Sequence, residues 1–210
     1  RWRRPACGSI MTRDARVGRV LVAALQQAIA EELPTRSEFY DHWLAPDGRR
    51  DGTLGIAPMA AVVGFLRTEG GGYDRVVRRA GALVAEWTWR ERAAWRRRWT
   101  TRLPLTMRAR AVSRHMRAVV TETCSGTVAR CRVTHGVVSL EIDDSVFCSA
   151  REAPAAPLCG FYMALFVEAC SAAGLIAEAD GAWCRTRPVD VAPTGKGSGC
   201  GGRFVVSLAG

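Results

Sequence analysis

Apolar residues recur every three or four positions through most of the first half of the chain, a spacing that predicts amphipathic helices. Such a helix is expected from Thr12 to Leu33, just before Pro34. Its apolar positions are Val17, Val20, Leu21, Ala24, Leu25, Ala28 and Ile29. Shorter or weaker versions of the pattern predict helices over residues 37–46, 58–67, 73–99 and 106–115. The three glycines at 70–72 are expected to form a flexible joint before the longest of them.

The hydrophobic period changes from helix to strand after Arg117. Apolar and polar residues alternate over 119–124, 127–134 and 137–142, with Ser125-Gly126 and His135-Gly136 between these runs. Two short connections in succession predict an antiparallel meander of three strands. Two more strands are expected over 182–191 and 203–208, the first with Pro188 at an edge or a bulge.

A buried helix is expected between these two groups of strands, from Pro157 to Gly174. Proline suits the first turn of a helix, and glycine suits the position after its end. The apolar residues cover more than one face, which is typical of a helix buried on all sides. They are Leu158, Phe161, Tyr162, Leu165, Phe166 and Val167. Such a helix is either plain core or the wall of an apolar pocket.

This order of elements predicts an α+β fold, with helices packed on an antiparallel sheet of four to five strands. A length of 210 residues, 48% of them hydrophobic, suits one core better than two. We expect a leader or disordered N-terminus at 1–11, a helical part at 12–116, and a strand-rich part of the same domain at 117–210.

The net charge of +10 would suit an acidic partner, but almost all of the positive charge is arginine, which a GC-rich coding sequence also produces. No nucleic-acid motif accompanies it, so nucleic-acid binding is not favoured. The segment from Trp87 to Trp99 mixes indole and guanidinium groups. Three interpretations remain open for it: a solvated helix face, a lid over an apolar pocket, or a surface for a membrane or nucleic acid.

No apolar run is long enough to span a membrane, and the basic first residues are not followed by the apolar stretch of a signal peptide. The eight cysteines are therefore expected as reduced thiols in the cytoplasm rather than as disulfides. Of the three histidines, His42 is expected on a helix surface and His135 at an exposed hairpin tip. His115 lies beside Arg114 and Arg117, which favour a neutral imidazole.

The second half of the chain resembles the 4-vinyl-reductase-type, or hydrocarbon-binding, domain. That family shares its fold with Bet3-like trafficking subunits and haem nitric-oxide-binding domains. The resemblance covers roughly residues 117–210, with a looser match through the N-terminal helices. The residues that carry it are Phe147-Cys148, Arg151, the run from Pro157 to Tyr162, Trp183-Cys184, Gly199-Cys200 and Phe204-Val-Val206.

The resemblance implies a pocket for a small hydrophobic molecule between the helices and the sheet, and a homodimer formed through N-terminal helices. In the aromatic-sensing members, three cysteines and a glutamate hold zinc, and Cys159, Cys184 and Cys200 fall on those cysteine positions. Gly181 stands where the family has its glutamate, and the interval from Cys184 to Cys200 is longer than usual. Cys148 or Cys170 could supply a fourth sulfur. Haem is not favoured, because no histidine stands where the resemblance would place a proximal ligand.

Three functions are weighed. The first is a binding domain for a small apolar or aromatic ligand, acting in small-molecule or secondary metabolism. Its expected ligand-binding residues are Phe161, Tyr162, Phe166, Trp87, Trp95 and Arg151. The second is an enzyme, hydrolase or reductase-like, with Cys159 as the nucleophile at a helix start. The third is an interaction or scaffold protein that uses the Arg/Trp face.

Overall fold

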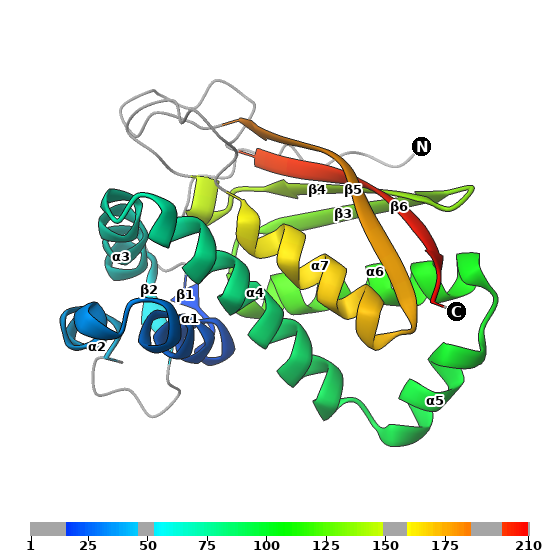
Figure 1. Cartoon of the computed structure of the whole chain (residues 1–210), viewed down its shortest axis with the longest axis horizontal. Helices are drawn as coiled ribbons and strands as arrows, with labels where there is room; N and C mark the ends of the chain where they lie inside the picture. The colour runs from blue at the N-terminus through cyan, green and yellow to red at the C-terminus, as the bar shows by residue number, and fades with distance from the viewer. Residues whose placement is uncertain (1–15, 46–52, 149–158, 186–198, 210) are drawn as a thin grey trace, which may run out of the picture.

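The chain folds with helices on one face of an antiparallel sheet, as the computed structural model in Figure 1 shows. The structure describes residues 16–45, 53–148, 159–185 and 199–209. In that part of the chain the helices are α1 (Arg19–Glu32), α2 (Ser37–Leu44), α3 (Ile56–Thr68), α4 (Gly71–Glu91), α5 (Ala94–Arg102), α6 (Leu105–Thr123) and α7 (Gly160–Ala172). Short 3-10 turns occupy Pro34–Arg36 (η1) and Val146–Cys148 (η2).

Four strands form the main sheet: β3 (Val128–Thr134), β4 (Val137–Asp143), β5 (Leu175–Arg185) and β6 (Gly199–Leu208). Their order across the sheet is β3-β4-β6-β5, and each neighbouring pair is antiparallel. The last strand in the sequence is therefore one of the two inner strands. A separate two-stranded sheet joins β1 (Arg16–Val17) to β2 (Leu54–Gly55). The predicted α+β class and the four-stranded sheet are confirmed.

Helices α6 and α7 lie directly against the sheet, and α4 packs on the other side of α7 (Figure 1). The core between α7 and the sheet consists of tightly packed aromatic rings. Phe147 stacks on Phe161 with ring centroids 4.9 Å apart, and Phe166 meets Phe204 at 4.5 Å. All four side chains are completely buried. Helix α7 is thus the buried helix that its sequence predicts.

The strand predicted over 119–124 is wrong, because α6 continues to Thr123. Its β-branched residues also satisfy the helical period, and Val112, Met116, Val119 and Val120 bury one continuous face of α6. The expected three-strand meander is therefore a single hairpin of β3 and β4, with its turn at His135-Gly136 as predicted.

The long helix predicted over 73–99 is also two helices. Arg92 and Ala93 adopt extended backbone angles between α4 and α5. The break places the Arg92 guanidinium over the Trp89 ring, 4.7 Å from its centroid, an arrangement that cation–π attraction favours.

The three glycines before α4 begin the helix instead of forming a joint. Gly70 has φ +59° and immediately precedes α4, while Gly71 and Gly72 lie in its first turn. Strands β5 and β6 begin earlier than the alternation indicates, at Leu175 and Gly199. The positions from 186 to 191 of the predicted strand, including Pro188, lie outside the described residues, as do residues 1–11.

In the described part of the chain, every helix is too short or too polar to cross a lipid bilayer.

Candidate functional site

Four cysteines from four separate segments meet at one end of α7; we call them the thiol cluster. Cys148 ends the η2 turn, and Cys159 is the residue that caps the N-terminus of α7. Cys184 and Cys200 are direct partners across β5 and β6. Cys148, Cys159 and Cys200 are completely buried, and Cys184 is half-buried. The three positions predicted from the resemblance are thus brought together, with Cys148 as the fourth.

Hydrogen bonds between sulfurs connect all four residues. Cys148 bonds with Cys184 and with Cys200, and Cys159 bonds with Cys200. Cys159 Sγ also lies 3.9 Å from the Trp183 carbonyl oxygen, to which it can donate only while it is protonated. Cys200 is the hydrogen-bond partner that Cys148 and Cys159 share.

Glycines let the backbone approach closely enough to assemble the cluster. A Cβ at Gly160, the residue after Cys159, would lie 2.9 Å from Asp74 Oδ1 of α4. A Cβ at Gly201, the residue after Cys200, would lie 2.5 Å from the Trp183 ring. A side chain at Gly201 would also meet backbone, the Leu140 carbonyl oxygen at 2.4 Å, so glycine is needed beside Cys200, whereas at Gly160 the Asp74 side chain could move aside.

Hydrogen bonding within the cluster separates the pKa values of its members. Bonds from Cys184 and Cys200 outweigh burial and lower the pKa of Cys148 to about 4. The bond from Cys200 likewise lowers the pKa of Cys159. The same bonds, with burial, raise the pKa of Cys200 far above its ordinary value. The cluster therefore favours thiolates at Cys148 and Cys159, with a protonated Cys200 donating to both.

A hydrogen-bond network holds Cys148 in place. The Tyr162 and Ser145 hydroxyls are 2.7 Å apart in the core, and the Phe147 backbone N–H donates to Ser145 Oγ at 3.1 Å. Arg67 of α3 donates to the Phe147 carbonyl oxygen at 3.1 Å, and its positive charge also favours the Cys148 thiolate. Tyr162 therefore fixes the turn that carries Cys148 to the cluster.

The donor chemistry of the cluster fits a thiophilic metal such as zinc. Zinc binds cysteine sulfur at about 2.3 Å in a tetrahedron, which places the sulfurs about 3.8 Å apart, a normal S–H···S distance. As the side chains stand, however, no set of three or more Cys, His, Asp or Glu among the described residues encloses a metal position. Gly181, at the position of the family's glutamate, is exposed on β5 and offers no side-chain ligand.

Cys170, the other candidate for a fourth ligand, is apart from the cluster. It lies near the far end of α7, where burial raises its pKa to about 12 and Cys131 is a neighbour. All seven cysteines in the described part of the chain are free thiols.

The predicted ligand-binding residues do not share a pocket. Phe161, Tyr162 and Phe166 are packed in the core, Trp87 is half-buried on α4, and Trp95 is 60% exposed on α5. Arg151 lies outside the described residues. Two hollows, of about 540 and 320 Å³, lie along α6, and neither is lined by a residue of α7.

The histidines occupy the environments expected of them. His42 is exposed on α2, and His135 is exposed at the tip of the β3–β4 hairpin. The His115 ring packs edge-on against Trp89, with centroids 5.3 Å apart, and its Nε2 is 3.3 Å from Thr88 Oγ1. Burial lowers the pKa of His115 to about 4, helped by Arg92, so the imidazole is neutral as predicted. The neighbour responsible is Arg92 rather than Arg114 or Arg117.

Two features of the site were missed from the sequence. The sequence indicates Cys148 only as an alternative fourth ligand, although it is the cysteine whose pKa falls to about 4. Arg67, the cation beside it, is indicated only as the end of a predicted helix. Burial of this segment is indicated by the apolar run Val146-Phe147-Cys148. Nothing in the local pattern shows which other thiols contact Cys148.

The fold and the cluster together define an α+β domain with a buried four-thiol site. This chain matches no protein-family model, no curated protein and no solved structure.

Proposed function

We propose that this chain is a binding domain of the 4-vinyl-reductase type, and that its thiol cluster takes up zinc. The observation that carries the proposal is the convergence of Cys148, Cys159, Cys184 and Cys200 from four segments, linked by sulfur hydrogen bonds. Four thiols and no imidazole are a donor set that zinc prefers.

The protonation pattern supports this assignment. A metal displaces protons from its thiol ligands, and two of the four already favour the thiolate form. Bound zinc would cross-link η2, α7, β5 and β6 and so stabilise the end of the domain where they meet.

The rest of the proposal follows from the resemblance. The domain would bind a small hydrophobic molecule in small-molecule or secondary metabolism and would act as a homodimer. The free state of the described cysteines fits a reducing compartment, so we propose the cytoplasm.

Cobalt(II) titration of the reduced, metal-free protein tests the metal site. We expect one cobalt per chain, a sulfur-to-cobalt charge-transfer band in the near ultraviolet, and displacement of the cobalt by one equivalent of zinc. Cys159→Ala and Cys200→Ala should each weaken cobalt binding at least about tenfold, because each removes one thiolate ligand.

Cys170→Ala is the matched control, because it removes a buried thiol of α7, the helix that Cys159 caps, and this thiol lies outside the cluster. It should keep the band and the affinity. Circular dichroism of each variant shows whether the fold is retained. Absence of the band from the parent protein, or an equal loss in Cys170→Ala, would overturn the zinc proposal.

A second candidate is an enzyme with a thiolate nucleophile, as the lowered pKa values of Cys148 and Cys159 favour. Iodoacetamide labelling followed by peptide mass spectrometry distinguishes the two. Rapid labelling of either cysteine at pH 7, unaffected by zinc, supports a nucleophile. Labelling that one equivalent of zinc blocks supports the metal site.

A further inference from the structure

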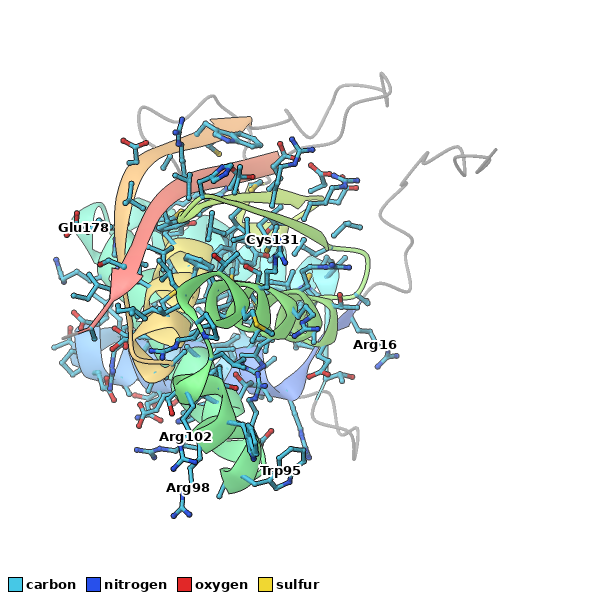
Figure 2. The ribbon with its side chains drawn as sticks, turned by 90° about the vertical axis from the view of Figure 1, so that its right-hand side faces the viewer. Arg16, Trp95, Arg98, Arg102, Cys131 and Glu178 are labelled. Carbon is cyan, nitrogen blue, oxygen red and sulfur yellow. The ribbon has the colours of Figure 1, made fainter. Side chains whose placement is uncertain are left out.

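A hollow of about 540 Å³ lies between α6 and β3. Strand β3 is one edge of the four-stranded sheet, and β5, which carries Cys184, is the other. Figure 2 shows Cys131 of β3 beside α6. A volume of this size is within the range of small-molecule sites.

Arginines line the α6 side of the hollow. Arg110, Arg114 and Arg117 are spaced four and three residues apart, so they share one face of α6. Arg132 of β3 also borders the hollow, but it alternates with Cys131 and Val133, so its side chain lies on the opposite face of the strand. None of the three α6 arginines forms an ion pair with a carboxylate in the described part of the chain. Three like charges along one side of the hollow repel each other, and a bound anion would relieve that repulsion.

The remaining lining is largely apolar. Leu103 and Met107 contribute from the start of α6 and the residues before it, and Cys131 and Val133 contribute from β3. Burial raises the pKa of the Cys131 thiol to about 11, so it is uncharged at neutral pH. The lining therefore combines an apolar wall with guanidinium groups, which suits a molecule that has both an apolar body and an acidic group.

Ser113 adds an independent indication. It lies on α6 among the lining residues and is only 5% exposed. In the described part of the structure its Oγ has no nitrogen or oxygen partner, and its polar neighbour is the Cys131 thiol of the same hollow, a weak hydrogen-bonding group. An oxygen acceptor placed in the hollow would give this hydroxyl a stronger hydrogen bond.

We propose that this hollow is a binding site for a small amphiphilic anion, a carboxylate or a phosphate monoester that carries an apolar body. The oxyanion is held by the guanidinium groups of Arg114 and Arg117, which can donate two parallel hydrogen bonds to it. Ser113 donates to the same ligand, and the apolar body lies against Met107 and Val133. The site is independent of the thiol cluster and of any metal there.

Titration with three probes of equal chain length tests the charge requirement: octanoate, octyl phosphate and octylammonium. Binding is followed by calorimetry and by backbone amide NMR shifts of the full chain. We expect octanoate or octyl phosphate to bind and to shift amides of α6 and β3, with octylammonium binding at least about tenfold more weakly. The relative affinities for octanoate and octyl phosphate show whether the site prefers a carboxylate or a phosphate.

Variants locate the site. Arg114→Gln with Arg117→Gln should weaken the preferred anion at least about tenfold, because charge-assisted hydrogen bonds are lost. Arg98→Gln with Arg102→Gln removes the same charge from α5, where both side chains project away from the sheet (Figure 2), and should leave binding within about twofold. Ser113→Ala should weaken binding severalfold without loss of folding.

Three results would overturn the proposal: equal binding of octylammonium, amide shifts confined to other elements, or equal weakening by the two double variants. Loss of cobalt binding at the thiol cluster leaves this proposal untouched, since the probes, the variants and the shifted amides all lie on α6 and β3.

Discussion

The backbone of Gly81 in α4 is so close to Phe161 in α7 that a Cβ at Gly81 would lie 2.2 Å from the Phe161 carbonyl oxygen. The two helices meet here without an intervening side chain. This contact holds the start of α7, and with it Cys159, against α4.

Replacing Gly81 should therefore destabilise the domain. Alanine in a helix normally gains about 0.5–1 kcal/mol over glycine, but at Gly81 the clash with backbone outweighs this gain. Overpacking in a core costs about 1–3 kcal/mol, and we expect a net loss of about 2 kcal/mol for Gly81→Ala in chemical denaturation. Gly64→Ala is the control, since nothing lies within 4 Å of that position in α3, and it should stabilise slightly. Equal effects would contradict the close contact.

Tyr162→Phe tests whether that residue supports the turn carrying Cys148. It removes the hydroxyl 2.7 Å from Ser145 Oγ in a fully buried position. Loss of the bond should cost about 1–2 kcal/mol in the free energy of unfolding. A double-mutant cycle with Ser145→Ala should give a coupling energy of about 1 kcal/mol. Additive effects of the two substitutions would mean that the hydroxyls do not interact.

Cys200→Ala in the metal-free protein should raise the pKa values of both Cys148 and Cys159. Cys200 donates to each thiolate, so its removal takes away a bond that favours the charged form. A hydrogen bond to a charged group is worth about 1.5–3 kcal/mol, which corresponds to roughly one to two pKa units. Thiolate absorbance near 240 nm, followed against pH, measures the change. Cys170→Ala, outside the cluster, should leave both transitions in place.

The protein should become less stable as the pH is lowered, because His115 titrates. Its pKa is about 4 in the folded chain, against about 6.5 when unfolded. Between these values the unfolded chain binds a proton that the folded chain excludes, so the free energy of unfolding decreases as the pH falls from about 6.5 to about 4. Because the ring is partly exposed, we expect the free energy of unfolding to decrease by about 1–2 kcal/mol over this pH range. Denaturation curves across this pH range measure the loss.

His115→Gln should flatten that part of the profile, because glutamine has no proton to gain. His42→Gln, on the exposed surface of α2, should not. A profile that His115→Gln leaves unchanged would assign the pH dependence to other groups.

Periodicity alone predicted the fold class, the hairpin turn at His135 and the burial of α7. It failed where one run of residues fits two periods. Val119, Val120 and Thr123 suit a strand by composition, and only their packing with Val112 and Met116 makes them helical. The break at Arg92 is not marked by a proline or a glycine, and the contact between Arg92 and the Trp89 ring that accompanies it exists only in the folded protein.

The site was less accessible to sequence reasoning than the fold. The resemblance placed Cys159, Cys184 and Cys200 together, and the structure brings them into one cluster. The pKa of Cys148 depends on which thiols donate to it, which only the closed fold determines. The spacing of Arg110, Arg114 and Arg117 is visible in the sequence, but the edge strand that completes their hollow is not.

The inner position of β6 also has a consequence for biosynthesis. Strand β5 and the β3–β4 hairpin cannot join into one sheet until residues 199–208 have left the ribosome. During translation, Cys148, Cys159 and Cys184 are therefore made before their common partner Cys200 is present. The nascent chain exposes these sulfurs to oxidants and to free metal ions until β6 pairs with its two neighbouring strands.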